Sequence, residues 1–175
     1  MRAPFLPVLA SALIAGTFAL PALAEETREL DSHEHGHVTL QIAVEGSDLL
    51  VSLEAPGESI VGFEHVAETD EQKAAVDAAR QTLTDADALF TLPDEAGCSS
   101  RSAEVELHQE AEHNAFEATY AFTCSDMNAL TSLSVSLFTL YPSIEEIDVD
   151  YATPAGQGSQ ELEADAPTLD LPMAS

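Results

Sequence analysis

The sequence predicts an α+β fold: a mainly antiparallel β-sheet built from hairpins, with one long helix packed on one face of the sheet. Three observations lead to this prediction. From His37 onward, apolar and polar residues alternate with the two-residue period of a half-buried strand. Residues 70–84 instead place apolar residues at helical spacing. The length of 175 residues suits one core with tails, and no internal repeat divides it.

Residues 1–24 have the features of a secretory signal peptide. Arg2 precedes an apolar run from Ala3 to Leu20, and Ala22-Leu23-Ala24 supplies the small residues of a cleavage site after Ala24. An uncleaved anchor helix is the alternative, since the segment is just long enough to span a bilayer. Three prolines suit such a helix poorly (Pro4, Pro7 and Pro21). We therefore expect an exported protein whose mature form does not span the membrane.

A polar, histidine-containing arm over residues 25–36 precedes the first hairpin. The hairpin turns at Gly46-Ser47, and pairing 44 with 49, 42 with 51 and 40 with 53 keeps its apolar residues on one face. Pro56 to Ala67 reads as a loop. Thr69 and Gln72 then have the spacing of a capping box, which predicts a helix over 70–84. The apolar stripe of this helix consists of Ala75, Val76, Ala79 and Leu83.

The second predicted hairpin pairs strands near 102–109 and 114–124. This pairing brings Cys98 and Cys124 together at its open end, and an even cysteine count in an exported protein favours a disulfide. A two-thiolate metal site is the alternative, but such sites generally use closer cysteine pairs. Further strands are expected at 131–141, 146–153, 159–163 and 168–171. Residues 37–171 then form a single domain, with 172–175 as a tail.

The charge balance excludes several partners. The chain has 32 Asp and Glu against 5 Lys and Arg, a formal net charge of −27. Binding nucleic acid or an anionic membrane requires a basic surface, so neither is expected. A hydrophobic content of 45% that is patterned along the chain indicates a folded acidic domain.

The histidine cluster His33-Glu34-His35-Gly36-His37 predicts a metal site. On an extended chain, side chains two residues apart point the same way, so the three histidines can converge on one cation. Imidazole binds Zn, Cu and Ni, so the residues do not specify the element. A solvated polar arm is the alternative. In the predicted hairpin, Glu54 lies near His37, and the following loop supplies Glu64 and His65; these three are candidate additional ligands.

His108 and His113 flank the tip of the second hairpin beside several glutamates. They form a weaker candidate metal site, with a solvated acidic turn as the alternative. Motifs for nucleophilic or phosphate-binding enzymes are absent from the sequence, so no enzymatic activity is expected.

The most characteristic segments of the sequence are His33 to Leu40, Val61 to His65, Thr69 to Lys73, Phe116 to Cys124, and Leu137 to Tyr151 followed by Gly156-Gln157-Gly158. In this combination and order, they resemble the ZrgA family of exported zinc-uptake proteins. The resemblance implies a periplasmic protein that binds zinc and works with an inner-membrane ABC importer, either delivering the metal or buffering it. The long run of His, Asp and Glu found between the two cysteines in many members is reduced here to residues 108–113. The alternative function is a structural or interaction module of the envelope that binds no specific metal.

Overall fold

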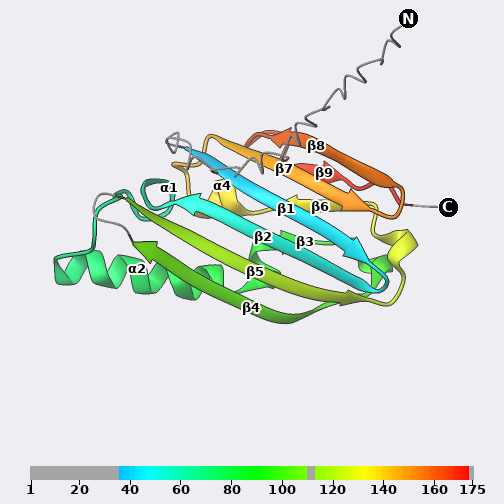
Figure 1. Cartoon of the computed structure of the whole chain (residues 1–175), viewed down its shortest axis with the longest axis horizontal. Coiled ribbons are helices and arrows are strands. Elements are labelled where there is room, and N and C mark those ends of the chain that lie inside the picture. Colours follow the sequence, from blue (N-terminus) through cyan, green and yellow to red (C-terminus); the bar gives the residue numbers. More distant parts are fainter. Residues whose placement is uncertain (1–35, 110–112, 174–175) are drawn as a thin grey trace, which may run out of the picture. The chain divides into compact units, whose positions relative to one another are not determined.

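Six long strands form the main sheet of the protein. The structure is a computed structural model that describes residues 36–109 and 113–173. The strand order in this sheet is β4-β5-β2-β1-β7-β8 (Figure 1). The bounds are β1 His37–Glu45, β2 Asp48–Pro56, β4 Cys98–Gln109, β5 Asn114–Cys124, β7 Glu146–Thr153 and β8 Gly156–Leu162.

All neighbours in this sheet are antiparallel except β1 and β7, which run parallel. In this parallel pair, His37 lies opposite Glu146 and Thr39 opposite Asp148. The predicted register of the first hairpin is confirmed, with Leu40 opposite Leu53. One face of the sheet therefore carries the alternating apolar residues and the other carries the polar ones.

A small second sheet packs on the apolar face. Its strands are β3 Phe90–Thr91, β6 Ser132–Val135 and β9 Thr168–Asp170, in the order β3-β6-β9. The Phe90 ring meets the rings of Tyr120 and Phe122 edge to face, with centroids 5.0 and 6.3 Å apart. Such contacts stabilise a core beyond the area that the rings bury. The core thus lies between two sheets.

The helices are short, with one exception. They are α1 Gly57–Val61, α2 Asp70–Leu83, α3 Ala86–Leu89 and α4 Leu137–Leu140, with 3-10 turns at Asp94–Ala96 and Met127–Ala129. The capping box at Thr69 is confirmed: its hydroxyl accepts from Gln72 N–H, and the Gln72 side chain accepts from Thr69 N–H. Within the described residues, no helix is long and apolar enough to cross a membrane.

The predicted α+β class, with a long helix covering one face of the sheet, is wrong. The protein is mostly β-sheet, and the second sheet lies where the helix was expected. Helix α2 has 14 residues but buries only Val76, Ala79 and Leu83, and it lies along the β4 side of the sheet (Figure 1). The stripe is too narrow to cover six strands. The short strands β3, β6 and β9, which are distant from one another in sequence, cover the main sheet instead. No local sequence pattern predicts how these three strands pair.

Two predicted segments differ in detail. The strand expected over 131–141 ends at Val135, and the chain then forms α4, so Leu137 is buried from a helical turn. The loop expected over Pro56 to Ala67 contains the single turn α1.

The predicted disulfide between Cys98 and Cys124 is present in the structure. The two residues are directly opposite in the β4–β5 register, so the bond closes the open end of this hairpin. In the chain-entropy account, a crosslink that closes a loop of this size restricts the unfolded chain by about 3–4 kcal/mol.

Tyr120 connects α2 to the main sheet. Its hydroxyl donates a hydrogen bond to the carbonyl oxygen of Leu83, 2.9 Å away, and the side chain is fully buried. Burial raises the pKa of Tyr120, and the nearby Tyr141 adds to this effect, so the hydroxyl remains a donor at all ordinary pH values.

Replacing Tyr120 by Phe should lower the free energy of unfolding by about 1–2 kcal/mol, because the Leu83 carbonyl loses its buried donor. Urea denaturation followed by circular dichroism measures this change. Equal stability of the variant and the parent would show that the hydroxyl does not hold α2 in place.

Candidate metal centre

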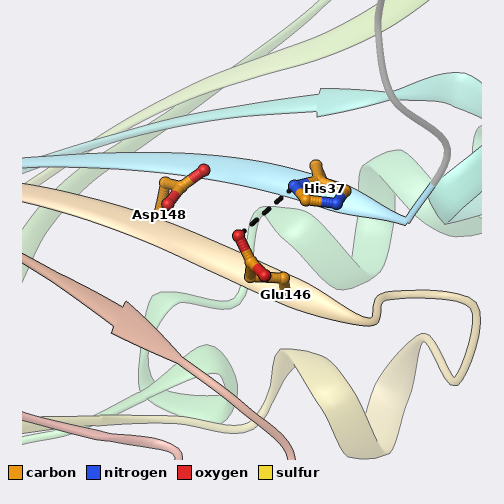
Figure 2. Close-up of side chains that lie close together, drawn as sticks. All are labelled: His37, Glu146 and Asp148. Atoms are coloured by element: carbon orange, nitrogen blue, oxygen red, sulfur yellow. Dashed lines mark ion pairs between the residues drawn. The ribbon is translucent and has the colours of Figure 1, made fainter.

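The polar face of the main sheet brings His37 beside two carboxylates of β7. Ile147 and Val149 point into the core, so Glu146 and Asp148 point to the opposite face. Because β1 is parallel to β7 and His37 is the register partner of Glu146, the imidazole lies on that same face. Figure 2 shows the three side chains converging from the two strands.

These three side chains have the spacing of metal ligands. One ligand atom from each of His37, Glu146 and Asp148 lies within 4.8 Å of the others. The His37 Nδ1 atom is 3.4 Å from Glu146 Oε1 (Figure 2). Two ligands of a tetrahedral zinc ion with bonds of 2.0–2.1 Å are about 3.3 Å apart. A small shift of Asp148 would therefore complete three positions of such a site.

The environment of Glu146 disfavours its negative charge when no cation is present. Partial burial raises the pKa of Glu146, and the charges of Glu161 and Asp148 raise it further, while His37 lowers it. Its side chain is 27% exposed. A divalent cation would offset the repulsion among these carboxylates. The negative charges that repel one another in the metal-free protein would thus attract a bound cation.

Gly36 fixes the chain immediately before the histidine. Its N–H donates to the hydroxyl oxygen of Ser59, which is buried in α1, at 3.2 Å. Its carbonyl oxygen accepts from the N–H groups of Glu145 and Glu146, at 2.8 and 3.2 Å. The main chain at His37 is thus tied both to α1 and to the start of β7.

This position requires glycine. Gly36 has a φ of +86°, and a Cβ atom there would lie 3.0 Å from Cγ of Glu145. A residue with a side chain would therefore be strained at this position, both by the left-handed backbone and by the close approach of Glu145.

The profile described as "ZrgA family zinc uptake protein" matches residues 32–171, which is most of the chain. The chain belongs to the ZrgA family of zinc uptake proteins. The family expected from the sequence is therefore confirmed. No curated protein sequence matches the chain.

The donor set agrees with the zinc role of the ZrgA family. One imidazole nitrogen and two carboxylate oxygens are ordinary zinc ligands, and a fourth position can be filled by water or by another side chain. The ZrgA family is a zinc uptake family and not a family of enzymes.

The remaining predicted ligands of the first site are placed as follows. His33 and His35 lie outside the described residues. Glu54 is exposed on the polar face, but Thr39 of β1 lies between it and Asp148 in the strand register. Glu54 therefore does not belong to the group formed by His37, Glu146 and Asp148.

His65 and Glu64 have neighbours of their own. The His65 ring stacks on Phe63, its Nδ1 atom lies 2.9 Å from the Val66 carbonyl oxygen, and its Nε2 atom lies 3.4 Å from the Gln72 side chain. Glu64 Oε2 lies 3.4 Å from Nδ1 of His113. Within the described residues, neither side chain joins the three-ligand group around His37.

His108 and His113, the weaker candidate pair, face different carboxylates. Nε2 of His108 lies 3.2 Å from Glu117 and 3.4 Å from Glu106, whereas His113 lies beside Glu64.

Glu146 and Asp148 are candidate ligands that the sequence prediction did not include. Their outward direction follows from the alternation in residues 146–153, which the sequence shows. Their proximity to His37 depends on a parallel pairing between strands about 110 positions apart, for which the sequence has no local signal.

Replacing Gly36 by Ala should lower both stability and zinc affinity. The left-handed backbone costs an L-residue about 1–2 kcal/mol, and displacing Glu145 disturbs the neighbouring candidate ligand Glu146. Gly46→Ala is the matched control, because Gly46 has a φ of +62° but nothing within 4 Å of an added Cβ. Both variants should lose stability in urea, and only Gly36→Ala should lose zinc affinity in calorimetry. Unchanged zinc affinity in Gly36→Ala would show that this residue does not position the site.

Proposed function

We propose that this protein binds Zn²⁺ as a cargo in the periplasm, at a site built on His37, Glu146 and Asp148, and passes it to an inner-membrane ABC importer or buffers it. The observation that carries the proposal is the convergence of the three ligand atoms within 4.8 Å on the face of the sheet that bears the polar residues. Membership of a zinc uptake family supports zinc over other cations. The disulfide supports an exported protein, since such bonds persist in oxidising compartments.

The arm supplies the remaining ligands in this proposal. His35 and His33 precede the anchored Gly36 by one and three residues, so the covalent chain keeps both close to His37. Together with His37 and the carboxylates of β7, they provide more donors than the four that zinc requires. His65, Glu54 and Glu64 are secondary candidates in this proposal, because none belongs to the three-ligand group.

The exposure of the site fits a cargo that is taken up and released. The side chains of His37 and Glu146 are 35% and 27% exposed, and Asp148 is exposed. Structural zinc sites are closed and mostly use cysteine thiolates, which hold the metal permanently. An open site of imidazole and carboxylate groups allows an incoming ligand from a partner to replace a bound one.

Metal-free, untagged mature protein should bind one Zn²⁺ tightly in calorimetry at neutral pH. His37→Ala, His35→Ala and Glu146→Gln should each weaken binding by more than the 10–100-fold typical for loss of an outer-shell partner, because each removes a ligand. Asp150→Asn is the control, since Asp150 follows Asp148 on the same face of β7 but lies outside the three-ligand group. Unchanged zinc binding in His37→Ala would contradict the proposal. It would favour the alternative function, a structural or interaction module of the envelope that binds no specific metal.

Zinc affinity should fall as the pH is lowered, because histidine and carboxylate side chains bind a metal only in their deprotonated forms. The raised pKa of Glu146 means that it takes up its proton at a higher pH than an ordinary carboxyl group. Glu146→Gln should therefore make the dependence of log Kd on pH shallower at the acidic end. Calorimetric titrations at several pH values test this; an unaltered slope would argue against Glu146 as a ligand.

The same shift has a consequence for the metal-free protein. A carboxyl group whose pKa is higher in the folded state binds more protons there than in the unfolded chain. The contribution of Glu146 to stability is therefore full below the ordinary pKa of a glutamate, and it is lost as the pH rises through the raised pKa of the folded state. Without zinc, Glu146→Gln should be at least as stable as the parent at neutral pH in urea denaturation. Lower stability would show that Glu146 has a structural role.

A further inference from the structure

A buried hydroxyl group lies beside the main chain that leads into the candidate metal centre. Ser59, in α1, is only 2% exposed. Its Oγ atom accepts a hydrogen bond from the N–H of Gly36, 3.2 Å away. A polar group that is shielded from water generally has such a partner, because it has lost its hydrogen bonds to water. The bond therefore joins α1 firmly to the residue before His37.

The Ser59 hydroxyl takes the place of a strand neighbour. The pairing of β1 with β2 ends at Thr39 and Glu54, and β2 itself ends at Pro56, where the chain turns into α1. Among the described strands, the first two residues of β1 are thus paired only with β7. The hydroxyl supplies an acceptor on the unpaired side. Gly36 is therefore held from α1 through its N–H and from β7 through its carbonyl oxygen.

The turn that carries Ser59 is itself fixed by Asn114, the first residue of β5. Gly57 begins α1 and approaches Asn114 so closely that a Cβ atom on Gly57 would overlap Oδ1 of Asn114. Nδ2 of Asn114 donates to the carbonyl oxygen of His65, 2.9 Å away. One buried side chain thus contacts both the first residue of α1 and the loop that follows it. A turn fixed at both ends presents Ser59 to Gly36.

We propose that Ser59 is a positioning residue of the zinc site. Its hydroxyl fixes the main chain one residue before His37, so that the imidazole stays beside the two carboxylates of β7. A ligand that is already held in place loses less freedom when the metal binds, which raises the affinity. Ser59 therefore acts through His37 and not on the ion. This inference rests on the proposed zinc-binding function.

Ser59→Ala in untagged, metal-free mature protein tests this role. Zinc affinity in calorimetry should fall by about 10-fold, the lower end of the range for residues that orient metal ligands. Ser134→Ala is the matched control, because the Ser134 hydroxyl also makes one hydrogen bond, to Thr168 at 2.8 Å in the small sheet. Urea denaturation records the stability of both variants, and only Ser59→Ala should lose zinc affinity. Equal zinc affinity in the two variants would overturn the proposal.

Cobalt(II) distinguishes a positioning residue from a ligand, because its visible absorption spectrum depends on the ligands and their geometry. At saturating Co²⁺, Ser59→Ala should give the same spectrum as the parent, reached at a higher Co²⁺ concentration. His37→Ala should give a different spectrum, because it lacks a nitrogen ligand of the proposed site. A spectrum of altered shape in Ser59→Ala would mean that a ligand has been lost, and it would overturn the positioning role.

The zinc affinity of His37→Ala separates this inference from the proposed function. If His37→Ala loses affinity and Ser59→Ala keeps it, only the role of Ser59 is wrong. If both variants keep the affinity of the parent, the site at His37 is wrong, and the role of Ser59 is wrong with it. A loss in Ser59→Ala alone would overturn both, because Ser59 could not then act through His37.

Discussion

The parallel pairing of β1 with β7 is the interaction on which the candidate site depends. It alone brings His37 to Glu146 and Asp148, because the two strands are separated by nearly the whole domain in sequence. Parallel neighbours require a long crossover, and here that connection contains the disulfide hairpin, α2 and most of the small sheet. The three candidate ligands therefore meet only in a chain that has folded almost completely.

On the polar face, the stability of the sheet conflicts with the clustering of carboxylates. A sheet is more stable when opposite charges face each other across strands, yet this face places carboxylates beside carboxylates. The buried face, with its aromatic contacts and its covering sheet, supplies the stability that permits this arrangement. Binding sites often retain such unfavourable groupings, because the ligand resolves them.

Local features of the fold were predictable from the sequence, whereas distant pairings were not. The first hairpin follows from the alternation around Gly46, the start of α2 from Thr69 and Gln72, and the disulfide from two cysteines at the open end of a hairpin. The layer that covers the core depends on strands of two to four residues, which have no periodicity to detect. For the site, His37 was predictable from its cluster, but its carboxylate partners were not.

The anchoring of Gly36 has a consequence for metal exchange. A residue spans at most about 3.3–3.6 Å of chain, so a histidine one or three residues before Gly36 is tethered within about 4 or 11 Å of that point. Tethering gives a ligand a high effective concentration at the site, whatever the concentration of the protein. In the proposed zinc site, an ion released by one histidine would be recaptured by another before it diffused away. Exchange would then proceed in single-ligand steps, and a partner that supplies its own ligands would replace them one at a time.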